Sequence, residues 1–446
     1  MPRMFWLSLV IASWGGDLVA QLPAIDTRTL TTITPEQAAS LGGPLTQVDL
    51  SGLEELSVAA AKELARPIMQ LDLSGLKSLP DEVAVALAGH DGTLVLDGLT
   101  SLSDQGAESL ARHVSGLSFK RLKRLSDEAM ASLARSRPIV FLDGLEELSD
   151  GQAEALGASS CRVTLNGVKS LTDSQFRAIT ACRGGMYLNS LTSLSDAQAE
   201  TLVGRQGELE LNRVESLTDH QLDMVSRVRG DLYLRGLTTL SDSGAEFLSF
   251  HESALYLDGL TSLSLNAAEA LARHAGHLSL NGLTDLSEDS AYALGHHRGT
   301  LSLDGVRTMS GRVAHLLSGN EGTLHLGGLV ALSDESAAGL ACHRGSLLLS
   351  SVESLSAEAA ASLGKHEGTL FLDQVTSLPD DVAQGLANHR GELYLHAVSS
   401  LSDAAAMALA RHRGYVSLGN MVSMSDAAAA ALSKQNVSVN RPAATE

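Results

Sequence analysis

Residues 94–116 read LVLDGLTSLSDQGAESLARHVSG, and nearly all of the chain consists of copies of this unit. Its leading leucine returns as an aliphatic residue every 23 positions, with no insertion or deletion. The series is Val48, Leu71, Leu94, Leu117, Val140, Val163, Met186, Leu209, Leu232, Leu255, Leu278, Leu301, Leu324, Leu347, Leu370, Leu393 and Val416, and one further step in each direction reaches Ile25 and Val439. A period of this size is typical of a solenoid. The 446 residues are therefore predicted to form one elongated array of about eighteen coils.

The first part of the unit has the pattern of a short strand followed by a turn. Positions 1 and 3, Leu94 and Leu96, are apolar on either side of a variable residue, so one face of the strand is buried. Position 5 is often glycine and position 6 is aliphatic, as in Gly98 and Leu99. This predicts that the chain leaves the strand there.

The second part predicts a helix of about eight to ten residues. Position 10 is Ser or Thr in all but two copies and position 11 is usually Asp, which is typical of a helix N-terminus. In the two exceptions, Pro80 and Pro379, an Asp follows, and we expect the cap to move one residue along. Positions 14, 17 and 18, such as Ala107, Leu110 and Ala111, form an apolar stripe. His or Arg near the end and Gly at position 22 indicate a C-terminal cap.

The consensus LxLxGLxxLSDxxAxxLAxH resembles the leucine-rich repeat, closest to its cysteine-containing subfamily. Leu171-Thr172-Asp173 and Leu217-Thr218-Asp219 match the subfamily's LTD step before a helix, and the resemblance covers residues 25–440. These repeats are shorter, lack the leading leucine of LxxLxL, and carry Leu or Val at position 6 where Asn or Cys is typical. The resemblance implies an α/β fold: a right-handed solenoid, or horseshoe, with a parallel β-sheet on the concave face and short helices on the convex face. It implies no single activity.

The two ends of the array depart from the repeat. Residues 1–20 have the layout of a secretory signal peptide, with an apolar run too short to span a bilayer; an N-terminal capping segment is the alternative. Residues 21–47 predict a polar capping coil, 48–438 the continuous array, and 439–446 a strand stub and tail, with a last strand at 437–439. We expect a periplasmic or extracellular protein if the leader is cleaved, and a cytoplasmic one otherwise.

Composition narrows the function. A net charge of −20 disfavours nucleic acid and anionic membranes as partners, and no stable membrane insertion is expected. There is no nucleophile elbow or phosphate-binding glycine loop, so we predict no enzyme, no catalytic residue and no cofactor. Cys161, Cys182 and Cys342 are too few for a disulfide framework. A bridge between Cys161 and Cys182 is conceivable, although two buried or half-buried thiols are favoured.

Two polar columns recur with the period. Histidines occupy position 20 in many coils, namely His90, His113, His251, His274, His297, His343, His366, His389 and His412. A metal row is one interpretation; helix-end capping is favoured, because Arg205, Val228 and Asn320 stand there in other coils. Acidification is then expected to charge the row and loosen the helical side.

Position 4 carries Asp97, Asp143, Asn166, Asn189, Asn212, Asp258, Asn281, Asp304 and Asp373. Calcium ligation is again the alternative to a structural role, here a turn after the strand.

The variable position 2 lies between the two buried strand residues and is expected to face outward on the concave sheet. It holds six aromatic residues: Phe141, Tyr187, Tyr233, Tyr256, Phe371 and Tyr394. Exposed aromatic residues are enriched at binding surfaces, whereas β-propensity alone also favours them in strands. Glu208, Glu210 and Asp231 would give this surface an acidic flank.

We therefore predict a non-catalytic scaffold that binds a protein or glycan through its concave sheet, using the six aromatic residues. Strands spaced by about 4.8 Å would give an inner arc on the order of 85 Å, which is ample for a standard interface. The alternative is a structural, spacer or self-associating role through the terminal strands. The chain is expected to be a monomer or to self-associate weakly.

Overall fold

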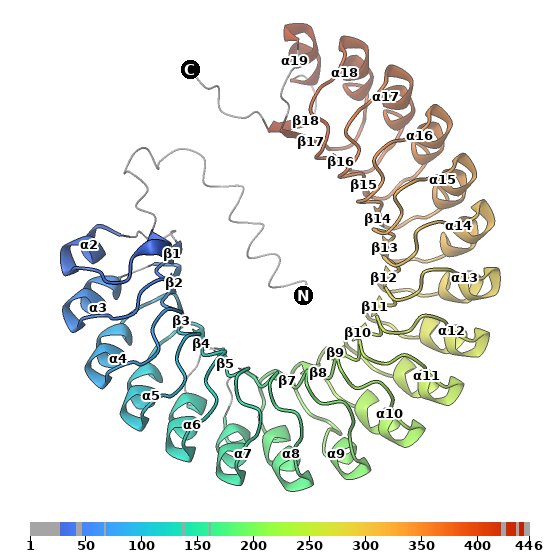
Figure 1. The fold of residues 1–446 in the computed structure, drawn as a ribbon. Coiled ribbons are helices and arrows are strands. Elements are labelled where there is room, and N and C mark those ends of the chain that lie inside the picture. The colour runs from blue at the N-terminus through green and yellow to red at the C-terminus, as the bar shows by residue number, and fades with distance from the viewer. Residues whose placement is uncertain are drawn as a thin grey trace.

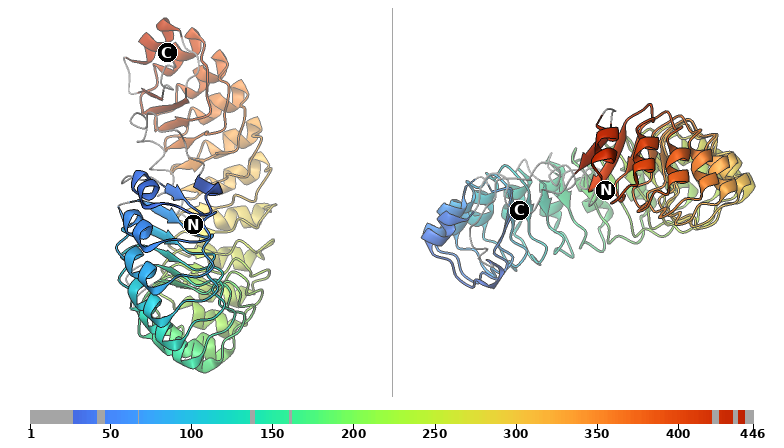
Figure 2. Two further views of the ribbon diagram at one scale, coloured as in Figure 1. Left: turned by 60° about the vertical axis from the view of Figure 1, so that its left-hand side comes forward. Right: turned by 90° about the horizontal axis from the view of Figure 1, so that it is seen from above.

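The computed structural model describes residues 27–41, 47–66, 68–135, 139–159, 162–420, 425–433 and 437–440. They form an open arc with strands on the inner side and helices on the outer side (Figure 1). The same two layers continue from one end of the arc to the other (Figure 2). The predicted leader, residues 1–20, and the tail, 441–446, lie outside the described residues.

A single 18-stranded parallel sheet lines the inside of the arc. Its strands are β1 (Gln47–Asp49), β2 (Gln70–Asp72), β3 (Thr93–Val95), β4 (Leu117–Ser118), β5 (Val140–Phe141), β6 (Val163–Thr164), β7 (Met186–Tyr187), β8 (Leu209–Glu210), β9 (Leu232–Tyr233), β10 (Leu255–Tyr256), β11 (Leu278–Ser279), β12 (Leu301–Ser302), β13 (Leu324–His325), β14 (Leu347–Leu348), β15 (Leu370–Phe371), β16 (Leu393–Leu395), β17 (Val416–Asn420) and β18 (Val437–Asn440). Each strand pairs with the next along the chain. The strands pair in the register that the predicted series gives, since Leu94 pairs with Leu117 and Leu117 pairs with Val140.

The last strand departs from this register. Val437, and not Val439, pairs with Val416, and Val439 pairs with Leu418. The sequence period placed Val439 opposite Val416, so that prediction is wrong by two residues. The connection from β17 to β18 is two residues shorter than a full repeat. Because a strand repeats every two residues, a shift of two leaves β18 in phase with the alternation of β17.

One short helix per coil forms the outer layer. A 3₁₀ turn, η1 (Thr27–Thr29), precedes the helices α2 (Pro35–Ser40), α3 (Val58–Leu64), α4 (Asp81–Leu87), α5 (Asp104–Leu110), α6 (Asp127–Ala134), α7 (Asp150–Gly157), α8 (Asp173–Thr180), α9 (Asp196–Glu200), α10 (Asp219–Ser226), α11 (Asp242–Ser249), α12 (Leu265–Ala272), α13 (Glu288–Leu294), α14 (Gly311–Leu317), α15 (Asp334–Leu340), α16 (Ala357–Leu363), α17 (Asp380–Leu386), α18 (Asp403–Leu409) and α19 (Asp426–Leu432). They have five to eight residues, so the longest of them reach only the lower end of the predicted eight to ten. They end early because the position-20 amide bonds three residues back, as His113 does to Leu110, which tightens the last turn.

The helix starts lie where the Ser-Asp step predicted them, and they also link neighbouring coils. The Ser195 hydroxyl accepts from the amide of Gln198 at 3.1 Å and donates to the Asp173 carboxylate of the preceding coil at 2.7 Å. The prediction for the two proline coils is wrong. Helices α4 and α17 begin in phase, with Pro80 and Pro379 at the N-cap and no side-chain cap bond. The fixed φ of proline already suits the entry to a helix, so the cap does not move.

The core is a continuous column of aliphatic side chains between the two layers. Leu94, Leu96, Leu99, Ala107 and Leu110 of one coil are fully buried, and the same positions are buried in most coils. The aliphatic residue at position 6 therefore packs in the interior. This is a leucine-rich-repeat solenoid with a parallel sheet inside and helices outside. Among the described residues, the helices are all too short to cross a bilayer.

Candidate binding surface

The side chains on the inner side of the sheet vary from coil to coil. The term concave face is used here for three sets of side chains, namely those at position 23 of one coil and those at positions 2 and 4 of the next coil. The aliphatic residues at positions 1 and 3 are buried in the core, so position 2 between them lies on the opposite, inner face of the sheet. The six predicted aromatic residues all lie in this column. They do not form a continuous file, because Glu210 separates the second from the third and four strands separate the fourth from the fifth.

The first cluster on the concave face combines a tyrosine, an arginine and a carboxylate. Arg162 Nη2 donates to Tyr187 Oη at 2.8 Å and pairs with Glu208, and the Tyr187 hydroxyl also donates to Glu208. The guanidinium carbon lies 5.9 Å from the centre of the tyrosine ring. Burial, together with the Glu208 carboxylate, raises the pKa of Tyr187, so its hydroxyl remains a donor.

The second cluster is a stacked pair. The rings of Tyr233 and Tyr256 are 4.2 Å apart with planes 5° from parallel. Arg235 lies over both rings, at 5.0 and 4.9 Å, and its Nε donates to Asp258 at 2.9 Å. His277 packs against Tyr256 at 5.1 Å. The prediction that these two tyrosines are exposed is wrong, since they are 4 % and 6 % exposed. The stacking covers their faces, and burial raises the pKa of both.

The third cluster is more open. Phe371 and Tyr394 stack at 4.6 Å with planes 9° apart, and both are half-buried. Tyr415 stands at 62° to Tyr394, 6.0 Å away. The Tyr394 hydroxyl donates to Glu392 Oε2 at 3.0 Å. Burial and the Glu392 carboxylate raise the pKa of Tyr394. Phe141 is also half-buried, and its strand neighbours Ser118 and Thr164 carry no ring.

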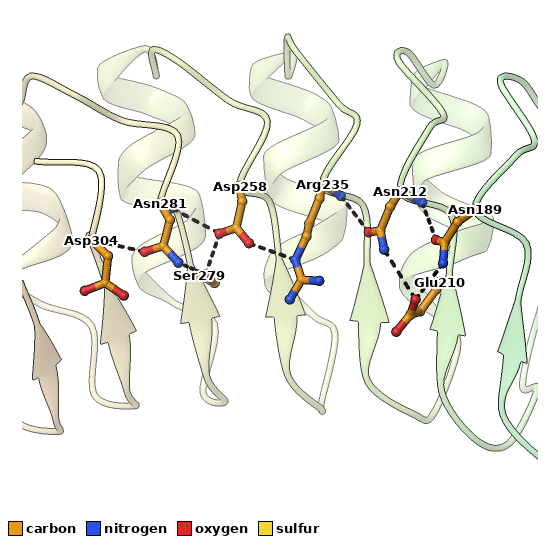
Figure 3. Close-up of polar contacts among 8 residues, drawn as sticks. All are labelled: Asn189, Glu210, Asn212, Arg235, Asp258, Ser279, Asn281 and Asp304. Atoms are coloured by element: carbon orange, nitrogen blue, oxygen red, sulfur yellow. Dashed lines mark hydrogen bonds and ion pairs between the residues drawn. The ribbon is translucent and has the colours of Figure 1, made fainter. Parts of the chain in front are cut away.

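Position 4 forms a side-chain ladder along the ends of the strands (Figure 3). The Oδ1 of Asn281 accepts the backbone N–H of Asp304 at 2.8 Å, and Asp258 accepts that of Asn281 at 3.1 Å. Eight of the nine predicted Asp and Asn residues accept the position-4 amide of the following coil in this way. Asp373 instead pairs with His396 Nδ1. Arg235 occupies position 4 of its coil but has no side-chain acceptor, so it cannot accept the next amide. Its Nε instead donates to Asp258. This bonding supports the structural role of position 4, and the described residues hold no group of three or more His, Cys, Asp or Glu suited to a metal ion.

The histidine column is buried between sheet and helices. The nine side chains are at most 4 % exposed, and adjacent rings stack with centroids 5.5–6.2 Å apart. His113 Nε2 lies 2.8 Å from Gly92 O, and His297 Nε2 lies 3.1 Å from Gly276 O. Most of them thus cap carbonyls of the preceding coil and not of their own helix. Burial lowers the pKa of these histidines, to about 4 for His274, His366 and His389.

Glycine at position 22 belongs to the same arrangement. Most of these glycines have ordinary negative φ, so a left-handed helix cap is not their role. A Cβ on Gly368 would lie 1.9 Å from Gly345 O, and one on Gly391 would lie 2.0 Å from Gly368 O. The coils therefore approach closely where a histidine also donates to the glycine carbonyl, as His366 does to Gly345 at 3.1 Å.

The concave face carries a surplus of negative charge. Its carboxylates are Asp49, Asp72, Asp97, Asp143, Glu208, Glu210, Asp231, Asp258, Asp304, Asp373 and Glu392. Its Lys and Arg side chains, within the described residues, are Arg28, Lys120, Arg162 and Arg235, and each is paired with one of these carboxylates. The acidic flank predicted around 208–231 therefore extends along the arc. A cationic surface would be attracted to it.

Sequence reasoning missed the arginines. Arg235 counted only as an interruption of the position-4 column, although it covers both stacked tyrosines. The available signal was spacing, because position 4 lies on the same strand face as position 2, so Tyr233 and Arg235 are neighbours. Cys182 is buried, and Cys161 lies outside the described residues. The predicted alternatives for this pair, a bridge or two thiols, therefore also lie outside the described residues.

Comparisons with known proteins yield matches of fold alone. No protein-family model and no curated protein matches the chain. Among solved structures, a Leptospira interrogans LRR protein is 15 % identical with a TM-score of 0.34, over 88 % of this chain and 93 % of that one. A Listeria monocytogenes internalin is 12 % identical with a TM-score of 0.29, over 92 % and 89 %. A chain of the Drosophila Toll–Spätzle complex is 15 % identical with a TM-score of 0.32, over 83 % and 48 %. We therefore infer function from the chain's own residues.

Proposed function

We propose that this leucine-rich-repeat solenoid is a non-catalytic scaffold that binds a protein partner through its concave face. One observation carries the proposal: the inner sheet gathers aromatic clusters and a surplus of carboxylates onto one continuous surface, while the core positions repeat almost unchanged. Tyrosine and arginine are among the residues that concentrate binding energy at interfaces, and phenylalanine is enriched in the cores of interfaces. A glycan is the alternative ligand, because rings beside carboxylates and amides also suit sugars.

The test compares concave and convex substitutions of the same kind. Phe141→Ala with Glu210→Ala changes the concave face. Phe250→Ala with Glu246→Ala changes helix α11 and its C-cap, Phe250, which is 72 % exposed. We expect the concave pair to weaken capture of the cellular partner by at least about tenfold. The convex pair should leave capture unchanged. Equal capture by both variants, or loss only in the convex one, would contradict the proposal.

A self-associating role is the second candidate, and β18 is the feature that favours it. Val437–Asn440 is the last strand of the sheet and pairs only with β17 among the described strands. An open strand edge is a template for pairing with another chain. Light scattering on the chain lacking residues 437–446 tests this role, since a smaller assembly than that of the full chain would support it.

We also propose export, on the basis of residues 1–20. The short apolar run and the small residues before Ala20 suit a cleaved leader. N-terminal sequencing of the protein from its own cells should then begin at Gln21. A mature chain that starts at Met1 would instead support a cytoplasmic protein.

A further inference from the structure

The three aromatic clusters of the concave face have a similar composition. Each sets a tyrosine hydroxyl or ring beside a carboxylate: Tyr187 beside Glu208, the Tyr233–Tyr256 pair beside Asp258, and Tyr394 beside Glu392. The first two contain a guanidinium from the chain itself. Arg162 lies between Tyr187 and Glu208, and Arg235 lies over both stacked rings while bonded to Asp258.

The third cluster, which we call the Tyr394 corner, has the rings and the carboxylate without the cation. It consists of Phe371, Tyr394, Tyr415 and Glu392. Tyr415 is tilted 62° to Tyr394, so the two rings meet at an angle, with exposed Glu392 bonded to the Tyr394 hydroxyl. In the described part of the chain, neither Lys nor Arg lies over these rings.

A histidine, His396, lies beside the Tyr394 corner, but both of its ring nitrogens contact other side chains. His396 lies 5.6 Å from Tyr394, at 64° to its plane. Its Nδ1 is 2.8 Å from Asp373 Oδ1, and its Nε2 is 3.1 Å from the Ser417 hydroxyl. Glu392 takes no part in this pairing, so its carboxylate keeps acceptor capacity beside the rings.

We propose that the Tyr394 corner binds an arginine or lysine side chain of a basic protein segment. This inference rests on the proposed concave function and names the partner class. The ring faces attract a cation, and Glu392 accepts a charge-assisted hydrogen bond from it. Arginine fits best, because a planar guanidinium stacks on a ring and donates to a carboxylate at once, as Arg235 does over Tyr233 while bonded to Asp258. The surplus of carboxylates along the arc attracts the rest of the segment.

Fluorescence anisotropy with a labelled nonaarginine peptide and the full chain tests this inference at 150 mM salt, which suppresses unspecific attraction. Tyr394→Leu and Glu392→Gln should each weaken binding about 3- to 30-fold. Tyr394→Phe keeps the ring and should stay within about twofold of the unmodified chain. Tyr292→Leu on α13 and Glu358→Gln on α16 are the matched controls, since both residues are exposed on the convex side. Each variant must retain the melting temperature of the unmodified chain.

The outcomes separate this inference from the concave function. If Tyr394→Leu and Glu392→Gln bind nonaarginine no more weakly than the controls, the cation site is wrong, even where the Phe141 and Glu210 variant loses its partner. If a neutral nonacitrulline peptide binds equally well, or cellohexaose displaces nonaarginine, the corner recognises a neutral ligand and the assignment fails. Selective loss in the two corner variants, with no binding of nonacitrulline, supports it.

Discussion

His366 Nδ1 lies 3.3 Å from His389 Nε2, and the same contact joins His389 to His412. At the far end, Gly414 N–H donates to His412 Nδ1 at 3.0 Å, and at the near end Gly345 O lies 3.1 Å from His366 Nε2. An amide can only donate and a carbonyl can only accept. The three rings are therefore neutral, each with its hydrogen on Nε2, and the chain of bonds runs in one direction across four coils.

This chain of histidines predicts loss of stability in weak acid. Burial and the neighbouring imidazoles lower the pKa of His366 and His389 to about 4, whereas an unfolded histidine titrates near 6.5. The unfolded chain then binds more protons between these values, so the folded state is fully stabilised above about pH 6.5 and loses stability as pH falls toward 4. Urea titrations at pH 7.5, 6 and 5 should show a falling free energy of unfolding.

A single substitution checks the cause. His389→Asn introduces the residue that Asn320 provides in the same column, where it donates to the carbonyls of His297 and Gly299. The dependence of stability on pH should become shallower by up to about 1.4 kcal/mol per pH unit. His220→Asn, at an exposed helical site, is the control. An unchanged slope in His389→Asn would contradict the neutral chain.

The position-4 ladder predicts a cost for removing one acceptor. Asn281→Ala leaves the amide of Asp304 without its partner, so the free energy of unfolding should fall by about 1–3 kcal/mol. Asn281→Asp retains the acceptor oxygen and should cost less. Urea denaturation measures both. Equal losses would show that the oxygen is not what matters at this position.

The stacked tyrosines should act on stability. Tyr256→Leu removes the ring stack with Tyr233 and the contact with Arg235, so we expect a loss of about 1–2 kcal/mol in the free energy of unfolding. Phe141→Leu, at a half-buried site with no ring on the adjacent strands, should change it by less than about 0.5 kcal/mol. If both variants unfold alike in urea, the stack contributes nothing.

The serine caps predict a similar local cost. Ser402 accepts from the amide of Ala405 at 2.9 Å and donates to Asp380 of the preceding coil. Ser402→Ala should lower the free energy of unfolding by about 1 kcal/mol. Ser399→Ala, at an exposed position of the same coil, is the control. A cap variant as stable as this control would place the stabilisation elsewhere.

Features that repeat with the period were predictable. The register of Leu94 with Leu117 and the cap at Ser103 depend on residue types that recur in nearly every coil. One coil therefore contains nearly all the information about its stacking on the next. The position-4 role followed for the same reason, although its side-chain bonds to the next coil were not foreseen.

Features that depend on which residues meet across coils were not predictable from position alone. The alternation around Tyr233 and Phe141 is identical, yet Tyr233 is buried because Tyr256 and Arg235 happen to adjoin it. The histidines were expected to cap their own helices, and the tighter last turn brings them against the preceding coil instead.

The sequence by itself determined that similar coils stack in parallel around an aliphatic core, because a strict period of apolar residues brings the same positions of successive coils side by side and buries them together. Only the tertiary structure decided which concave rings are covered and which remain open. That depends on side chains brought together from different coils, whose stacking, hydrogen bonds and ion pairs are not periodic.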